Sequence, residues 1–204
     1  MSVYERPRST TIMGEEEANL AGAKYCMPLT RREVILITSQ IVIASLVSEP
    51  VFGSVEDPRQ HGWRFCANCH LLFRGPDRAG TCPAGGQHQP AGYQFAIHKR
   101  LTEDLLKEAA APQDKWRKCK NCFSLFYNGY QQKGRCPAQG THVRDAETQL
   151  YLSHDRVPKR NEQPEWRFCK KCHGLFFDGY PKKGVCAGGG EHDKAGFFFL
   201  IPHV

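Results

Sequence analysis

Hydrophobic residues in the C-terminal part of the chain follow a pattern that occurs three times. Each copy begins with a Trp-Arg pair, continues with a Leu-Phe pair and ends in an aromatic and β-branched segment, at 93–97, 150–152 and 197–201. Short segments of this composition, separated by glycine-rich stretches, are typical of β-strands. A period of roughly 50 residues indicates small units in tandem. The pattern therefore predicts three consecutive all-β units.

The predicted units occupy residues 61–100, 115–154 and 166–204. Residues 101–114 predict a short helical linker, because Thr102 is a suitable N-cap, acidic residues follow it and Pro112 ends it. Residues 155–165 contain two prolines and many charges, which predict an extended, solvated linker. We expect the third unit to be freer than the other two unless the units pack together.

Cysteine and histidine occur at matching positions in every unit. Nine of the ten cysteines lie in the units, three in each, and a histidine follows each third cysteine. An odd number of cysteines argues against disulfides alone, whereas three thiolates and one imidazole complete a closed tetrahedral Zn²⁺ site. We predict about three structural zinc ions per chain, with iron or disulfides between units as alternatives. The predicted ligands are Cys66, Cys69, Cys82 and His88; Cys119, Cys122, Cys136 and His142; and Cys169, Cys172, Cys186 and His192.

Two sets of histidines could supply the fourth ligand. The set that we favour keeps a constant spacing from the third cysteine, whereas the later set varies in spacing and is interpreted as surface residues at strand ends. The two sets are His88, His142 and His192, and His98, His154 and His203, respectively. A further histidine follows the second cysteine in two units, but Phe123 takes its place in the other. That histidine therefore cannot be a common ligand.

Glycines at fixed positions complete the motif. Gly80, Gly134 and Gly184 stand two residues before the third cysteine, which predicts positive φ or a close approach to the metal. Each unit resembles a zinc ribbon, or rubredoxin-like metal knuckle, and more specifically the Trp-Arg-x-Cys-x-x-Cys-x-x-Leu-Phe … Gly-x-Cys-Pro-Ala-Gly-Gly-x-His repeat of bacterial proteins that are often exported. The resemblance covers residues 61–204 and departs most in the second unit. It implies a fold and a structural metal, but no activity.

Residues 1–60 are interpreted as a leader, an export signal and a linker. Arg31 and Arg32 precede a moderately hydrophobic stretch that ends at Val47, which resembles a twin-arginine signal with cleavage near Gly53. About 14 apolar-rich residues are too few to span a bilayer comfortably. A permanent anchor and a buried element of a soluble N-terminal part are the alternatives. Because this route exports folded proteins, zinc would be bound before the thiols met an oxidising compartment, so we expect a periplasmic, envelope or extracellular location, with the cytoplasm as the alternative.

Charge is unevenly distributed along the chain. Residues 1–60 carry six Lys/Arg and eight Asp/Glu, a net charge of −2, whereas residues 61–204 carry 22 and 13, a net charge of +9. Three loaded Cys3His zinc sites lower the second value to about +6. The basic part of the chain suits an anionic partner, but such a charge also serves solubility.

The sequence predicts binding or assembly rather than catalysis. A closed Cys3His site leaves no position for water or substrate, and no nucleophile elbow, His-Glu-x-x-His helix or phosphate loop occurs in the sequence. We expect an exported protein that binds a polymer, possibly a carbohydrate, or a protein; an intracellular nucleic-acid-binding protein is the alternative. The Trp-Arg pairs could form stacking platforms for a partner or pack in the core. They are Trp63 and Arg64, Trp116 and Arg117, and Trp166 and Arg167.

Overall fold

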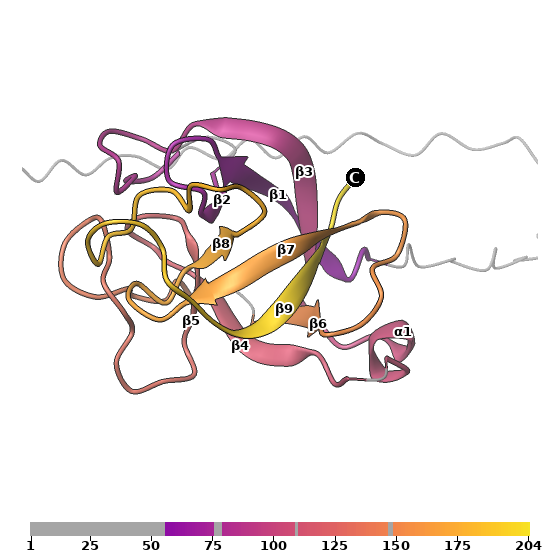
Figure 1. Cartoon of the computed structure of the whole chain (residues 1–204). Helices are drawn as coiled ribbons and strands as arrows, with labels where there is room; N and C mark the ends of the chain where they lie inside the picture. The colour runs from indigo at the N-terminus through magenta and orange to yellow at the C-terminus, as the bar shows by residue number, and fades with distance from the viewer. Residues whose placement is uncertain (1–55, 76–78, 109, 147–148) are drawn as a thin grey trace, which may run out of the picture. The chain divides into compact units, whose positions relative to one another are not determined.

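The computed structural model describes residues 56–75, 79–108, 110–146 and 149–204, which belong to one compact unit, Phe52–Val204. The predicted leader and twin-arginine signal lie outside the described residues. Within these ranges the chain forms nine β-strands and one short helix (Figure 1). The expected all-β fold class is confirmed.

Each repeat contributes three antiparallel strands in the same arrangement. The first strand is central, and a short strand and a closing strand pair with its two edges. The strands are β1 (Arg59–Cys66), β2 (Leu72–Arg74) and β3 (Pro90–His98) in repeat 1; β4 (Gln113–Lys118), β5 (Leu125–Tyr127) and β6 (Leu150–His154) in repeat 2; and β7 (Glu162–Cys169), β8 (Leu175–Phe177) and β9 (Lys194–Pro202) in repeat 3. This pairing places the tryptophan of each first strand opposite an apolar residue of its closing strand.

The closing strands join the repeats to one another. Strand β6 pairs with both β3 and β9 (Figure 1). An isolated bridge between Phe95 and His203 links β3 to the residue that follows β9. The closing strands therefore make a closed cycle of contacts, and repeat 3 returns to repeat 1.

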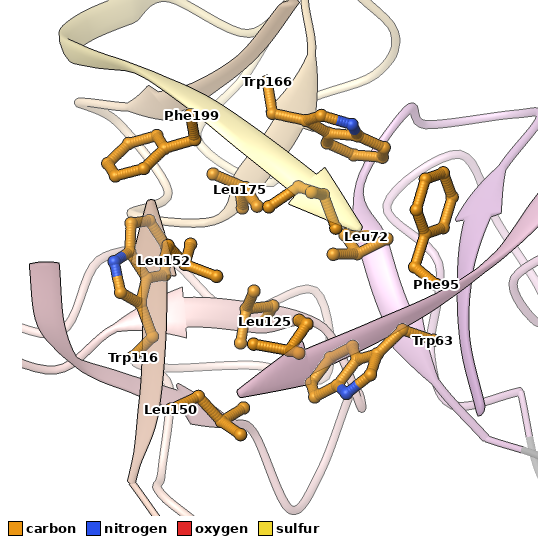
Figure 2. Packing of buried hydrophobic residues seen from close by; sticks show 12 residues of the cluster. Trp63, Leu72, Phe95, Trp116, Leu125, Leu150, Leu152, Trp166, Leu175 and Phe199 are labelled. Atoms are coloured by element: carbon orange, nitrogen blue, oxygen red, sulfur yellow. The ribbon is translucent and has the colours of Figure 1, made fainter. Parts of the chain in front are cut away.

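One hydrophobic core is shared by all three repeats. Figure 2 shows the three tryptophans surrounding the leucines that begin the short strands. The ring of Trp166 meets Phe95 of repeat 1 edge to face at 5.3 Å, and Trp116 meets Phe199 of repeat 3 at 5.2 Å. Each small unit thus buries its apolar face against the other two, because it has too little apolar surface of its own. The third repeat is not freer than the others: the repeats pack together.

The two linkers differ in how well they match the sequence prediction. Helix α1 (Glu103–Leu106) is confirmed, and the Thr102 hydroxyl accepts a hydrogen bond from the Leu105 amide at 3.3 Å. Most residues of the segment 155–165 are exposed, as expected of a solvated linker, but Arg156 pairs with Glu162 at 2.6 Å and with Glu108 at 2.8 Å, and both glutamate side chains are buried. Strand β7 begins within this segment. Two charges of this segment therefore bind one another, whereas its other charged residues are exposed.

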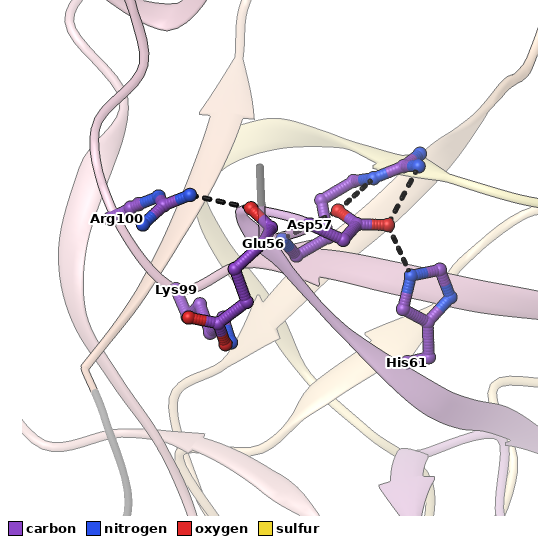
Figure 3. A network of polar contacts seen from close by, with 6 residues as sticks. Glu56, Asp57, His61, Lys99 and Arg100 are labelled. Carbon is purple, nitrogen blue, oxygen red and sulfur yellow. Dashed lines mark hydrogen bonds and ion pairs between the residues drawn. The ribbon is translucent and has the colours of Figure 1, made fainter. Parts of the chain in front are cut away.

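A polar network fastens the beginning of β1 to the end of β3 (Figure 3). The Asp57 carboxylate accepts hydrogen bonds from the Arg59 backbone and guanidinium and contacts His61 at 2.7 Å. The Glu56 carboxylate pairs with Lys99, and Arg100 donates to the Glu56 carbonyl oxygen at 2.6 Å. The guanidinium of Arg59 is the main reason why the pKa of Asp57 is lowered. Repeat 1 therefore begins a few residues before the predicted boundary.

Candidate metal centres

Three buried clusters bring together the predicted ligands. The first cysteine ends the first strand in repeats 1 and 3 and directly follows it in repeat 2. In each repeat the second cysteine lies in the adjacent turn, and the third cysteine and the histidine lie between the short strand and the closing strand. The four ligand atoms of each cluster lie within 4.8 Å of one another. The clusters are Cys66, Cys69, Cys82 and His88; Cys119, Cys122, Cys136 and His142; and Cys169, Cys172, Cys186 and His192. Each can hold a metal ion.

The distances within the clusters fit a tetrahedral ion. The first and third sulfurs are separated by 3.9, 3.9 and 3.7 Å in repeats 1, 2 and 3, and the second sulfur lies 3.3, 3.4 and 3.5 Å from the histidine Nδ1. Zinc–ligand bonds of about 2.3 Å to sulfur and 2.0–2.1 Å to nitrogen give tetrahedral edges of about 3.8 and 3.6 Å. A disulfide would need sulfurs about 2.05 Å apart. All nine cysteines of the described residues are free thiols, so the disulfide alternative is wrong there.

The histidine rings face the sulfurs through Nδ1, and in repeats 1 and 3 Nε2 lies against the neighbouring repeat, whereas His142 Nε2 is buried without a hydrogen-bond partner among the described residues. His88 Nε2 lies 3.2 Å from the Cys122 carbonyl oxygen, and His192 Nε2 lies 2.9 Å from that of Cys69. A metal at Nδ1 puts the proton on Nε2, which then donates to this carbonyl. Each ring also stacks on the phenylalanine of its own short strand, with centroids 4.7–4.8 Å apart. One imidazole thus serves a metal site and a junction between repeats.

The later histidines lie outside the metal clusters. His154 Nε2 is 3.0 Å from the Ala111 carbonyl oxygen, and its ring stacks on Phe197 at 3.9 Å. His203 stacks on Tyr93 at 4.2 Å. His98 ends β3. The spacing argument selected the histidines that the fold brings to the cysteines.

Protons and a cation compete for each cluster. In repeat 2, hydrogen bonds from Cys122 and Cys136 lower the pKa of the Cys119 thiol, whereas the contact with Cys119 raises the pKa of Cys136 to about 11. Cys119 and Cys136 raise the pKa of the Cys122 thiol. Three buried thiolates repel one another unless a cation lies among them. A divalent ion would therefore replace the shared protons and relieve this repulsion.

The glycine that stands two residues before each third cysteine allows two repeats to approach closely. All three glycines have positive φ, as predicted, but the close approach is to the next repeat and not to the metal. A Cβ on any of them would lie 2.3 Å from the carbonyl oxygen of the second cysteine in that repeat. The pairs are Gly80 with Cys122, Gly134 with Cys172, and Gly184 with Cys69. Repeat 1 thus contacts repeat 2, repeat 2 contacts repeat 3, and repeat 3 contacts repeat 1.

The residue after each second cysteine completes this cycle. His70, Phe123 and His173 have φ between 60° and 65°, and their carbonyl oxygens accept hydrogen bonds from the short strand of another repeat. The donors are the amides of Phe177, Arg74 and Tyr127, at 2.9–3.0 Å. Sequence reasoning excluded this position as a ligand but did not find its role, because the partner strand is distant in the chain.

Comparison of the chain with protein-family models, curated proteins and solved structures gives no match. Among the described residues, none of the helices is long and apolar enough to cross a membrane.

The Trp-Arg pairs are not exposed stacking platforms. All three tryptophans are 0% exposed and belong to the shared core, so the interpretation as partner-binding rings is wrong and core packing is confirmed. Arg167 is buried, stacks on Phe198 at 3.8 Å and donates to the Gly196 carbonyl oxygen at 3.0 Å. Arg64 and Arg117 are half-buried. The tryptophans thus hold the repeats together from within, whereas the arginines contact residues of their own repeat.

Two small pockets, which sequence reasoning missed, lie where repeats meet. Junction pocket A, of about 180 Å³, has walls from repeats 1 and 3 that include Tyr93 and Tyr180. Junction pocket B, of about 190 Å³, has walls from repeats 3 and 2 that include Phe197 and Tyr130. The lining residues of the two pockets occupy equivalent positions in the repeats. No single repeat contains a whole pocket, so a motif within one repeat could not reveal it.

Proposed function

We propose that the chain is a non-enzymatic binding protein in which each Cys3His cluster holds a structural zinc ion. The observation that carries this proposal is the enclosure of the clusters: all twelve ligands are buried, with no more than 5% exposed. A tetrahedral zinc ion with four protein ligands has no position for substrate. Bound zinc would fix the two turns that carry the ligands of each repeat. The ligand histidine, and the carbonyl group of the residue after the second cysteine, would in turn hold the neighbouring repeat in place.

Metal analysis tests the structural part of the proposal. Protein purified without added metal should contain about three zinc ions per chain, and Co²⁺ substitution should give the visible absorption of tetrahedral cobalt–thiolate sites. Folded protein that lacks metal and has all its thiols free would contradict it. Iron in place of zinc would retain the scaffold but refute the metal assignment.

The proposed partner is a polymer, possibly a carbohydrate, or a protein, met outside the cytoplasm. Support for export comes from the twin-arginine pattern and from the need to load the thiols before oxidation. N-terminal mapping of protein from the envelope or the medium tests this. A soluble cytoplasmic protein that retains residues 1–47 would contradict export.

One feature supports the alternative of an intracellular nucleic-acid-binding protein. An open groove of about 570 Å³ between repeats 2 and 3 is lined by Lys133, Arg135, Lys170 and Lys171. However, Lys170 pairs with Asp193 at 2.9 Å, and Lys171 donates to backbone carbonyl oxygens. A lysine that already contacts a carboxylate or a carbonyl oxygen attracts a phosphate group less strongly, so we place nucleic-acid binding second. Binding to DNA or RNA that weakens steeply with salt would reverse the order.

A further inference from the structure

We propose that junction pockets A and B are a matched pair of carbohydrate-binding sites, each of which takes one neutral sugar ring of a glycan. The inference rests on the proposed function as a binding protein and names its ligand class. The equivalent positions are Phe65 and Phe168, Tyr93 and Phe197, Phe95 and Phe199, Gln163 and Gln113, Phe177 and Tyr127, and Tyr180 and Tyr130, in pockets A and B respectively. Because equivalent positions of the repeats line both pockets, we expect both pockets to have the same function.

Exposed aromatic rings at the pocket walls are held in place by histidines. Tyr93 is 51% exposed and stacks on His203, with centroids 4.2 Å apart and ring planes 10° from parallel. Phe197 is 40% exposed and stacks on His154, at 3.9 Å and 13°. The imidazole covers one side of each ring and restricts its motion. A flat, preorganised apolar surface suits the C–H face of a pyranose and loses little entropy on binding.

A glutamine with a defined orientation adds a hydrogen-bond donor to each pocket. The Gln113 side-chain oxygen accepts from the Trp116 indole at 2.8 Å, and that of Gln163 accepts from the Trp166 indole at 3.1 Å. The indole donor fixes which end of the amide is oxygen. The NH2 group of each glutamine has no partner within the described part of the chain and is available to a ligand hydroxyl.

Size and charge favour a neutral sugar over other ligands. The volumes of 180 and 190 Å³ lie below the roughly 300 Å³ at which pockets begin to accept drug-sized molecules, so each has room for about one ring. Among the described residues, the lining of both pockets contains aromatic, glutamine, glycine and alanine side chains and no charged group. A phosphate would find no counter-charge there. Hydroxyl groups, in contrast, match the tyrosines and the amide.

The third junction does not repeat these walls. Between repeats 1 and 2, Lys118 and Arg74 occupy the positions of Phe65 and Phe177, and Lys118 pairs with Asp145 at 2.8 Å. We therefore infer two sites per chain. Two weak sites on one chain bind a polymer with more avidity than a monosaccharide.

Affinity electrophoresis of the full, zinc-loaded chain tests the proposal. The gels contain dextran, galactomannan or hydroxyethylcellulose, and pull-downs use insoluble chitin and cellulose, with heparin as a charged comparison. At least one neutral polysaccharide should retain the protein, with little change between 50 and 500 mM NaCl. The double variant Tyr93→Ala and Phe197→Ala should lose at least about tenfold in affinity. Phe198→Ala is the control, because Phe198 is 55% exposed, adjoins Phe197 and lies outside both pockets.

A second pair of variants keeps the test valid if the alanine variants fold poorly. Gln113→Glu and Gln163→Glu keep an oxygen for the indole but remove the NH2 donor, so they should also weaken binding. Retention by none of the neutral polysaccharides, or equal losses in Phe198→Ala and the pocket variants, would overturn the inference. If the chain binds none of the polysaccharides but holds three zinc ions, the structural-zinc proposal stands. Metal-free folded protein would instead refute that proposal, whatever the gels show.

Discussion

The contacts between repeats predict how much stability the protein loses when Gly134 is replaced by alanine. Gly134 of repeat 2 has φ +69°, and a Cβ there would lie 2.3 Å from the Cys172 carbonyl oxygen and 2.7 Å from the His173 ring. Gly140 has φ +65°, but a Cβ there meets nothing within 4 Å. Alanine at the two positions therefore suffers nearly the same backbone strain. Only Gly134→Ala also forces repeats 2 and 3 apart.

The expected magnitudes follow from these two effects. An L-residue in the left-handed region costs about 1–2 kcal/mol, which applies to both variants. Overlap with a neighbouring backbone adds about 1–3 kcal/mol for Gly134→Ala alone. For a compact unit of this size each kcal/mol lowers Tm by about 2–4 °C, so the two variants should differ in Tm by about 2–12 °C.

Tryptophan fluorescence in urea, at a fixed zinc concentration, measures the corresponding difference of about 1–3 kcal/mol in the free energy of unfolding, because the three indoles are buried in the shared core. Zinc transfer to a chromogenic chelator gives a second reading. In Gly134→Ala the zinc should leave at a lower chelator concentration than in Gly140→Ala, since the displaced carbonyl belongs to Cys172, a predicted ligand in repeat 3. Equal destabilisation by the two substitutions would refute the idea that the glycine serves repeat packing.

Three further predictions concern the metal, the buried ion pairs and the core. Chelation should unfold the described unit and make its nine buried thiols reactive toward a disulfide reagent, whereas a folded, unreactive apoprotein would contradict a structural metal. Arg156→Met should cost about 1–3 kcal/mol, because Glu108 and Glu162 would lose their shared guanidinium and keep only their contacts with Lys159. Burial alone would raise the pKa of Glu162, but the hydrogen bonds from Arg156 and from the Lys159 backbone, together with the positive charges of both residues, lower it. That stabilisation is present above the usual carboxyl pKa of about 4.3 and is lost as pH falls through the lower folded value, so the two proteins should converge in acid urea titrations. Leu125→Ala in the core should cost about 2–5 kcal/mol, whereas Leu106→Ala, at a 66% exposed position, should stay within about 0.5 kcal/mol.

The closed cycle also bears on how the metal sites depend on one another. The second cysteine of each repeat places its sulfur in one cluster and its carbonyl against a glycine of another repeat. In repeats 1 and 3 the histidine Nε2 also faces that carbonyl. Loss of one metal ion therefore loosens the turn that supports a second cluster. We expect release of the three ions to be cooperative.

The sequence by itself determined the local features. The spacing of Cys66, Cys69, Cys82 and His88, present in all three repeats, was enough to identify the ligands, because a metal shell is built from residues a few positions apart on two turns. The strands and the helix that follows Thr102 were also predictable, since alternation, glycine and capping residues act over short distances.

Only the tertiary structure decided what lies between repeats. The burial of the tryptophans, the ion pairs of Arg156 and the two junction pockets each require side chains from segments distant in sequence. A Trp-Arg pair looks the same in a sequence whether the indole faces solvent or another repeat. The deciding quantity is apolar area: a repeat of this size has too little to form a core alone, so the repeats close on one another. That closure buried the tryptophans in the core and created the two pockets at the junctions.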